Sequence, residues 1–280
     1  MANLSELKSQ IANTQDTNKI TKAMEMVATS KFKKLSNRVL SMQDYIRDTY
    51  KLFVDIIANT SQSQYMCDEG FKPGKTLWIL VGSNLGLCGG YNSNAIKLAK
   101  KHINKNDDFV VVGNKMRNFC RAENLNIVNE FLSVDEKFTI QDVTDGLTAD
   151  LISAYNNETI QSIKIIYTKF INNVTFEETV LDILPIVKLK KPSSNSEVIF
   201  EPSASEILKS SISFYLSTII FGSIMESQLS EQASRRQAMD NASKNGKDLV
   251  EELKSQFNRK RQENITQEIT EIVAGSTAQQ

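Results

Sequence analysis

The sequence has 280 residues, of which 40% are hydrophobic, and its 33 basic residues are balanced by 33 acidic ones. This length is sufficient for one sizeable domain with long helical extensions or for two modest domains. A formal net charge of zero excludes bulk electrostatic attraction to nucleic acid or to an anionic membrane, so we expect no nucleic-acid partner.

The three cysteines, Cys67, Cys88 and Cys120, are odd in number, widely spaced and free of any CxxC pair. This usage predicts neither a disulfide framework nor a zinc site and fits a reducing cytoplasm best. Residues 1–6 lack the basic and apolar regions of a secretory signal. The most apolar long stretch, residues 207–225, is interrupted by a lysine, several serines and a glycine, which favours a buried helix face over a membrane span.

The N-terminal segment, residues 1–60, predicts one long helix with an apolar seam. The seam residues follow alternating spacings of four and three, as in a left-handed coiled coil. They are Leu35, Val39, Met42, Ile46, Thr49, Phe53 and Ile56. At 1.5 Å per residue such a helix is on the order of 80 Å long, too long to be buried inside its own small domain.

The middle segment, residues 74–200, has a different rhythm and predicts a small doubly wound α/β domain. Short apolar runs at residues 76–82, 108–113 and 162–167 indicate buried strands of a parallel sheet. Helical stretches near residues 94–103, 115–123 and 143–155 separate them. This alternation of strands and helices is typical of a doubly wound sheet.

The C-terminal segment, residues 203–280, predicts a second long helix of roughly 100 Å. Its expected apolar face consists of Ala242, Gly246, Leu249, Leu253 and Phe257, followed by Ile265, Ile269, Ile272 and Val273. Two long amphipathic helices at opposite ends of one chain are expected to pair as an antiparallel coiled coil. The predicted fold class is therefore α/β, with this coiled coil added to the middle domain.

Two glycine-containing segments resemble nucleotide-binding motifs only in part. Gly74, Lys75 and Thr76 could end a phosphate-binding loop, but they precede a strand, whereas such a loop follows one. The loop at residues 82–90 follows a strand, yet its glycines do not fit the dinucleotide fingerprint. We interpret it as a tight turn, with Cys88 as a small packed side chain.

Residues for catalysis or for a metal site are missing from the pattern. The single histidine, His102, lies on an expected surface helix, and adjacent Glu177 and Glu178 are typical of a solvated surface. No active site, cofactor or metal is expected. The long helices instead bear localised basic groups that acidic loops of a surrounding partner could bind. These are Lys19, Lys22, Lys31, Lys33, Lys34 and Arg38, and Arg235, Arg236, Arg259, Lys260 and Arg261.

Three segments resemble the γ subunit of F-type ATP synthases. They read KITKAMEMVA at residues 19–28, GLCGGYN at residues 86–92 and ITQEITEIV at residues 265–273, and a weaker match lies at residues 169–172. The likeness spans the whole chain in the family's order. It implies a rotor shaft that couples rotation to ATP chemistry performed on the β subunits, with each β subunit meeting a different face. The implied partners are the α and β subunits, the epsilon subunit and the c-subunit ring, at the cytoplasmic face of a bacterial membrane.

The resemblance also implies which residues contact β. Met24 and Arg235 match positions near an acidic lever loop, whereas Arg261 and Gln262 match an upper contact region. Thr266 and Glu268 lie near that region, and the apolar tip at residues 265–273 would turn in an apolar collar.

The sequence departs from the family pattern at several positions. Ser83, Asn84 and Leu85 stand where the family usually reads Ser-Asp-Arg, and Asp240 stands where a lysine is usual; Arg236 and Gln237 replace apolar residues. These changes leave open a gamma-like shaft of a variant F-type ATPase that is not dedicated to proton-coupled synthesis. Two other classes of function stay open, a coiled-coil scaffold and an enzyme. The scaffold would self-associate through its seam without an ATPase partner, whereas the enzyme would bind a ligand at residues 82–90.

Overall fold

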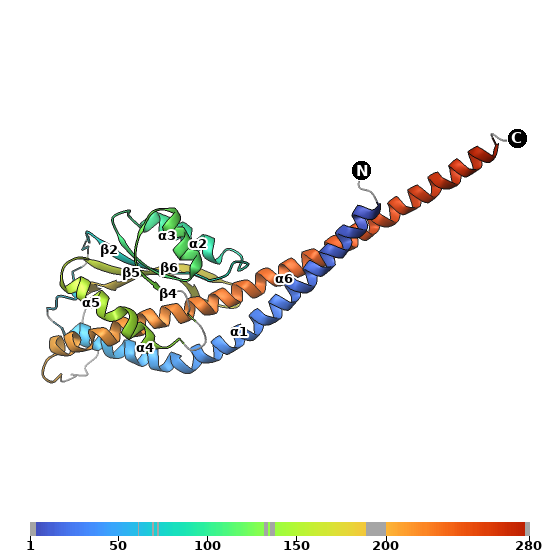
Figure 1. Cartoon of the computed structure of the whole chain (residues 1–280). Coiled ribbons are helices and arrows are strands. Elements are labelled where there is room, and N and C mark those ends of the chain that lie inside the picture. Colours follow the sequence, from blue (N-terminus) through green and yellow to red (C-terminus); the bar gives the residue numbers. More distant parts are fainter. Residues whose placement is uncertain are drawn as a thin grey trace. The chain divides into compact units, whose positions relative to one another are not determined.

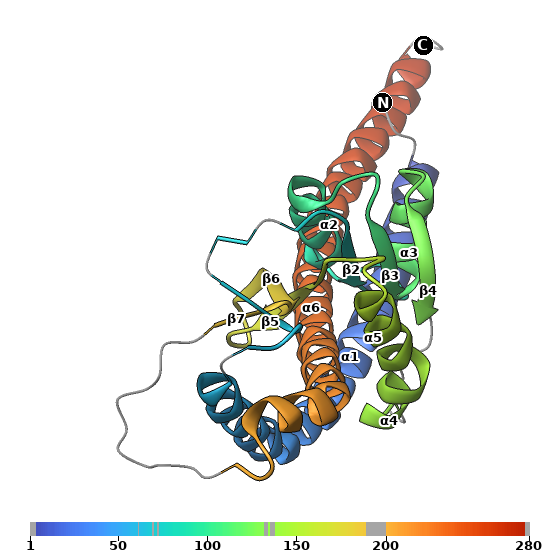
Figure 2. The same cartoon turned by 90° about the vertical axis from the view of Figure 1, so that its left-hand side faces the viewer.

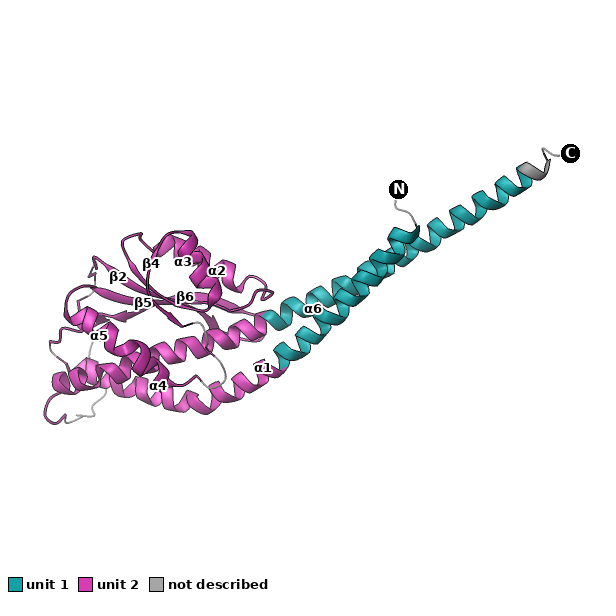
Figure 3. Ribbon diagram, in the orientation of Figure 1, with its two compact units in different colours: residues 1–29, 235–280 teal, residues 30–234 magenta. Residues whose placement is uncertain are grey.

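The computed structural model describes residues 4–60, 62–68, 70–71, 73–131, 134, 138–188 and 200–277, with side chains described to residue 274. Two helices dominate the chain: α1 covers Leu4–Asn59 and α6 covers Ala204–Thr277 (Figure 1). The chain divides into two compact units (Figure 3). Unit 1 contains residues 1–29 and 235–280, and unit 2 contains residues 30–234. The predicted fold class is confirmed; the predicted boundaries at 60, 74, 200 and 203 stay a prediction.

A five-stranded sheet forms the centre of unit 2, in the order β4-β3-β2-β5-β6. Its strands are β2 (Thr76–Val81), β3 (Asp108–Val112), β4 (Asn126–Phe131), β5 (Ser162–Phe170) and β6 (Phe176–Leu184). The first four are parallel to one another, whereas β6 pairs with β5 antiparallel. A separate pair of short strands, β1 (Met66–Cys67) and β7 (Ile186–Val187), is parallel.

Helices cover both faces of this sheet. The helices α2 (Tyr91–His102) and α3 (Asn114–Ala122) pack on the face that contains Trp78 and Phe109. The opposite face packs against α1, α6 and a helical stretch formed by α4 (Ile140–Val143), a π-helical turn (Thr144–Thr148) and α5 (Ala149–Asn156). Within unit 2 these helices lie side by side (Figure 1 and Figure 2). The connections through α2 and α3 lie on one face of the sheet, whereas the connection after β4 lies on the other. This change of face makes the sheet doubly wound.

Besides the short strands β1 and β7, the sequence pattern misses both edge strands of the five-stranded sheet. Strand β4 alternates exposed and half-buried residues, and β6 is mostly half-buried until Ile183. Edge strands lack the continuous apolar run that marks a strand covered on both faces. The three predicted strands, by contrast, occupy the buried centre of the sheet.

The apolar first third of α6 is part of the core of unit 2. Among the described residues, α6 is the one helix whose length and composition would allow a membrane span. Its apolar residues nevertheless pack inward, as Leu208, Leu216, Ile220 and Phe221 are buried against the sheet face. The predicted buried helix face accounts for this stretch.

In unit 1 the two helix segments pair through a seam that differs from the predicted one. Leu249 is 45% exposed, whereas Val250 is 7% exposed, and Ser243 rather than Ala242 is fully buried. The prediction of Leu249 as a seam residue is therefore wrong. The buried residues of α6 follow the coiled-coil spacings of four and three only if Ser243 is counted as a seam residue. The seam then runs through Met239, Ser243, Gly246, Val250, Leu253 and Phe257.

Candidate partner-binding surface

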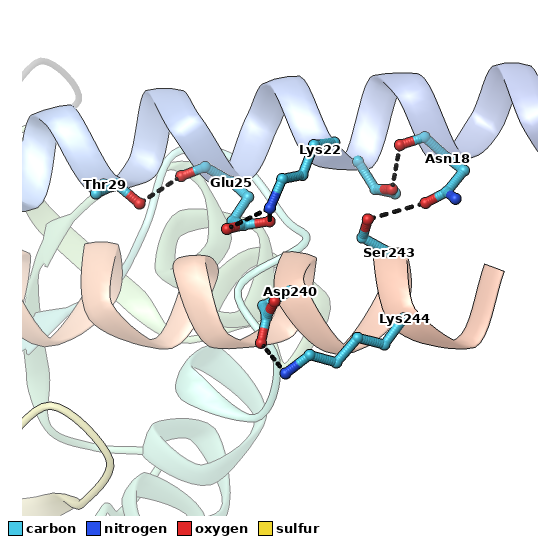
Figure 4. Close-up of polar contacts among 8 residues, drawn as sticks. Asn18, Lys22, Glu25, Thr29, Asp240, Ser243 and Lys244 are labelled. Atoms are coloured by element: carbon cyan, nitrogen blue, oxygen red, sulfur yellow. Dashed lines mark hydrogen bonds and ion pairs between the residues drawn. The ribbon is translucent and has the colours of Figure 1, made fainter. Parts of the chain in front are cut away.

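The middle of unit 1 has a close, polar helix contact. Asn18 of α1 accepts a hydrogen bond at Oδ1 from the Ser243 hydroxyl of α6, with an O–O distance of 2.9 Å (Figure 4). A Cβ atom added to Gly246 would lie 3.4 Å from the Asn18 side chain, so Gly246 packs beside Asn18. Because Asn18 faces Ser243 while Lys22 lies near Asp240, the two segments run antiparallel.

Ion pairs occupy several of the basic groups near this contact. Lys22 pairs with Glu25 at 2.8 Å, and Lys244 pairs with Asp240 at 2.7 Å (Figure 4). The Lys244 ammonium lowers the pKa of Asp240 below its ordinary value, through a hydrogen bond first and its charge second. Exposed pairs of this kind contribute about 1 kcal/mol or less, so an acidic partner can replace them.

The two residues predicted to face an acidic lever loop are not fully exposed. Met24 is half-buried on α1, and Arg235 on α6 retains 8% of its accessible surface. The large apolar residues exposed on this part of α1 are Ile20, Met26 and Val27 instead. Sequence reasoning missed them because a helical wheel cannot show which apolar residues lie outside the seam until its phase is known.

The four residues predicted for the upper contact region, Arg261, Gln262, Thr266 and Glu268, lie together on the last turns of α6. All four are exposed. From residue 261 to 274, every described side chain except the half-buried Asn264 is exposed. The seam of unit 1 ends before this point, because its last half-buried apolar residue is Phe257. The end of α6 therefore offers its whole circumference to a partner.

An apolar stripe runs along this end of α6. Ile265, Ile269 and Ile272 follow spacings of four and three, and their exposed fractions are 47%, 56% and 71%. At 3.6 residues per turn, Arg261 and Glu268 lie along one side of the stripe and Gln262 and Thr266 along the other. The predicted residues thus form two polar margins around an apolar centre.

Local ion pairs occupy two of the three basic residues that begin this end of α6. Arg259 and Lys260 both pair with Glu263, at 3.3 Å and 3.2 Å. The Lys260 ammonium and then the Arg259 guanidinium hold the pKa of Glu263 below its ordinary value. Arg261 makes no ion pair with any residue that the structure describes, and Glu263 is already shared. Arg261 is therefore the arginine of this run that can bind a carboxylate without breaking an internal pair.

The two glycine-containing segments lie at the two ends of β2. Lys75 pairs with Asp108 at 2.7 Å and directly precedes β2, so this segment leads into a strand, as the sequence predicts. Side-chain hydrogen bonds hold the loop at residues 82–90 in place, because the Asn92 amide donates to both Ser83 Oγ and Cys88 Sγ. Cys88 is buried, as predicted. Outside this loop, Cys120 is buried too, and burial raises the pKa of its thiol to about 12. In the described part of the chain, no three acidic, histidine or cysteine side chains could hold a metal ion.

The comparisons with known proteins agree over the full length of the chain. A family model described as ATP synthase matches residues 3–278. The ATP synthase gamma chain of Mycoplasma capricolum subsp. capricolum is 46% identical over 277 residues, 99% of each chain. That of Mesoplasma florum is 47% identical over 279 residues, again 99% of each.

A solved structure shows the same fold at much lower sequence identity. The structure of the Euglena gracilis mitochondrial ATP synthase, an OSCP/F1/c-ring assembly, contains a chain that matches with a TM-score of 0.74 and 17% identity. The match covers 98% of this chain and 94% of that chain. Identity at this level supports the fold alone, whereas the bacterial relatives carry the assignment. The chain therefore belongs to the ATP synthase gamma chain family.

Proposed function

We propose that this chain is the central rotor shaft of a rotary F-type ATP synthase, which couples rotation to ATP synthesis or hydrolysis on the β subunits. The observation that carries the proposal is the end of α6, where an exposed apolar stripe is bordered by Arg261, Gln262, Thr266 and Glu268. A helix end whose described side chains are almost all exposed, apolar along one face and polar at its margins, suits a surface that turns inside a collar. The chain supplies contacts, and the catalytic chemistry belongs to its partners.

The proposed partners are the α and β subunits of the catalytic hexamer, the epsilon subunit and the c-subunit ring. The Euglena neighbour belongs to an F1/c-ring assembly, and the relatives named ATP synthase gamma chain are bacterial. We accordingly place the chain at the cytoplasmic face of a bacterial membrane, as a peripheral subunit. These assignments are supported by family membership and stay proposals for this chain.

The mechanism follows from the lack of threefold symmetry in a pair of helices. Three β subunits around such a shaft each contact different side chains at any moment, so their nucleotide affinities differ. Rotation exchanges these contacts, which transfers free energy between the shaft and the nucleotide sites. A charge-assisted hydrogen bond from Arg261 is worth about 1.5 to 3 kcal/mol, which is small enough to form and break in every turn.

Met24 and Arg235 would act lower on the shaft. Both lie in unit 1, and their limited exposure favours contacts through a small part of each side chain. The neighbouring exposed apolar residues Ile20, Met26 and Val27 enlarge the surface available to a β-subunit loop. We include them in the proposed β contact.

One feature favours the second candidate, a gamma-like shaft of a variant F-type ATPase motor. Leu85 is 69% exposed at a position where the family usually has a charged residue, and Asn84 uses Oδ1 to accept the Asn114 amide. The loop at residues 82–90 thus presents an apolar side chain in place of two charges. A partner of different chemistry at this loop would distinguish the variant motor.

The test is affinity purification of the tagged chain from its native membrane, followed by mass spectrometry and an ATPase assay of the complex. Recovery with α, β, epsilon and c subunits supports the synthase shaft. Recovery with α- and β-like ATPase subunits but without a c ring supports the variant motor. Recovery of the chain with no ATPase subunit at all would refute both rotary functions.

A further inference from the structure

The carboxyl end of β5 extends beyond the strand that pairs with it. The parallel pairing between β2 and β5 ends at Leu80 and Ile166, whereas β5 continues to Phe170. The backbone groups of β5 past Ile166 therefore have no strand partner on the β2 side. Buried backbone N–H and C=O groups require hydrogen-bond partners, so another element has to supply them.

Helix α6 supplies these partners with side chains. The Thr168 N–H donates to Ser227 Oγ at 3.1 Å, and the Thr168 carbonyl accepts from the Ser230 hydroxyl at 3.0 Å. Two residues further along, the Phe170 N–H donates to Glu226 Oε1 at 3.3 Å. Backbone groups of residues i and i+2 point to the same edge of a strand, so α6 takes the place of a neighbouring strand along this edge.

The same face of α6 also holds the loop at residues 82–90 and the start of α2. The Ser234 hydroxyl donates to the Cys88 carbonyl at 2.7 Å, and Ser227 Oγ lies 2.8 Å from the Tyr91 hydroxyl. Ser227, Ser230 and Ser234 follow spacings of three and four, which places them on one face of the helix. Ser227 and Ser230 are fully buried.

Such bonds restrain motions that apolar packing permits. Hydrophobic burial is non-directional, and a helix that turns slightly on an apolar face keeps most of its buried area. Hydrogen bonds are directional and weaken steeply when misaligned. Turning α6 about its axis, or sliding it by one residue, would leave the buried backbone groups of Thr168 and the half-buried amide of Phe170 without these partners.

We propose that Glu226, Ser227, Ser230 and Ser234 form a polar seam that locks α6 against twisting on the sheet and so transmits torque between the helix and the α/β domain. The role in torque rests on the proposed rotor function. These four are positioning residues, because they act through the orientation of α6.

The first experiment tests the seam in the full-length chain by amide hydrogen exchange. Ser227→Ala removes the acceptor of the Thr168 N–H, and the exchange of this amide should accelerate about fivefold or more. Ser211→Ala is the matched control, since the bond that its hydroxyl makes within the described residues is to the Ile207 carbonyl of the same helix. Unchanged exchange at Thr168 in Ser227→Ala would overturn the seam.

The second experiment measures torsional stiffness in the assembled complex. A bead is attached to the α/β domain through Lys105→Cys in a Cys67→Ser background, the hexamer is immobilised, and the angular variance of the stalled rotor is recorded. We expect the variance to increase in Ser227→Ala/Ser230→Ala and, to a smaller extent, in Ser234→Ala. The single variant keeps the test available if the double variant does not fold.

The controls separate torque transmission from stability and from the proposed function. Ile163→Val loosens the same sheet away from the seam and should leave the variance at the wild-type value. Equal variance in the seam variants and the wild type would overturn the torque role. A wild-type complex that does not rotate would refute the proposed function instead, while the hydrogen-exchange result would still decide whether the seam exists.

Discussion

Gly113 shows how one residue fixes the carboxyl edge of the sheet. It precedes α3 with φ 89° and ψ 150°, a conformation that residues with a side chain rarely adopt. A Cβ atom at this position would lie 2.4 Å from the Gly82 carbonyl oxygen, which is backbone and cannot move aside cheaply. Gly113 therefore allows the loops after β2 and β3 to touch.

Replacing Gly113 by alanine should lower the free energy of unfolding by about 2 kcal/mol or more, through strain and the backbone clash together. Gly70→Ala is the matched control, because Gly70 has the same φ of 89° but a Cβ atom added there would meet no other atom within 4 Å. Urea unfolding followed by far-UV circular dichroism measures both. Equal losses in the two variants would show that the clash is relieved by a shift of the loop.

Arg261 is the residue whose charge the proposed β contact uses most directly. Arg261→Ala should weaken the contact of the shaft tip about tenfold to a hundredfold, as expected for the loss of a bond worth roughly 1.5 to 3 kcal/mol. Torque and synthesis in the reconstituted complex should fall while the chain stays folded. Arg259→Ala is the control, because Arg259 is already paired with Glu263. Unchanged torque in Arg261→Ala would remove it from the site.

Glu226 makes the stability of the polar seam on α6 depend on pH. Burial raises the pKa of its carboxyl above the ordinary value of 4.5, and the Phe170 amide, the Lys169 ammonium and the Tyr167 hydroxyl partly offset the rise. The folded chain thus binds this proton more tightly than the unfolded chain. The stabilisation that comes from protonated Glu226 is fully present below pH 4.5 and is lost as the pH increases through the raised pKa.

Glu226→Gln should therefore become more stable relative to the wild type as the pH rises from about 4.5 to 7, because glutamine never ionises. Glutamine keeps an oxygen that can accept the Phe170 amide. Urea unfolding of both chains at several pH values measures the difference. A difference that stays constant with pH, or that changes in the opposite direction, would contradict the raised pKa.

At the scale of elements, the helix pair of unit 1 depends on a seam that contains polar and small residues. Asn18, Ser243 and Gly246 allow close approach and a hydrogen bond, whereas Val250 and Leu253 provide apolar burial. A polar residue at such a position favours one register at some cost in stability. Stability in this unit therefore comes mainly from its few buried apolar side chains.

Val250→Ala should lower the free energy of unfolding by about 1.5 kcal/mol, because it removes buried apolar groups from the seam. The adjacent Leu249→Ala removes a larger but mostly exposed side chain and should cost less than about 0.5 kcal/mol. Thermal and urea unfolding monitored by the helical circular dichroism signal compare the two. A larger loss in Leu249→Ala would restore the seam predicted from sequence alone.

At the scale of the whole molecule, folding and partner binding draw on different parts of the chain. The core of unit 2 joins residues from both long helices to the sheet, whereas residues 261–274 contribute almost no buried surface. A helix of this length is marginal in isolation and adds little to global stability. The end of α6 is thus available for binding without a cost to the fold.

Removal of residues 261–280 should leave the free energy of unfolding within about 0.5 kcal/mol of the wild type. The same truncation should strongly reduce torque in the assembled complex, because it deletes both the apolar stripe and its polar margins. Unfolding experiments on the chain and rotation assays on the complex measure the two effects. A truncated chain that unfolds easily would show that these residues pack against another part of the protein.

Local periodicity in the sequence determined the two long helices and the three central strands, whereas the exposure of the apolar end of α6 was implied by the family resemblance alone. The helices and strands depend on the spacing of apolar residues within one segment, which the sequence displays directly. Leu77, Val110 and Ile165 lie in continuous apolar runs that predict strands, whereas β4 and β6 lie at edges and have no such run. The charged residues on the helices are visible in the sequence too, but their pairing is not.

Only the tertiary structure decided the phase of the unit 1 seam, the availability of Arg261 and the role of the serines of α6. A serine is compatible with a solvated surface, an intrahelical bond or a buried contact, and its own sequence neighbours do not distinguish these. Ser211 and Ser230 each bond to the carbonyl four residues back in α6, yet Ser230 also bonds to the Thr168 carbonyl. The deciding partner lies 62 residues away in the chain, so the hydrogen bond exists only once the sheet has formed.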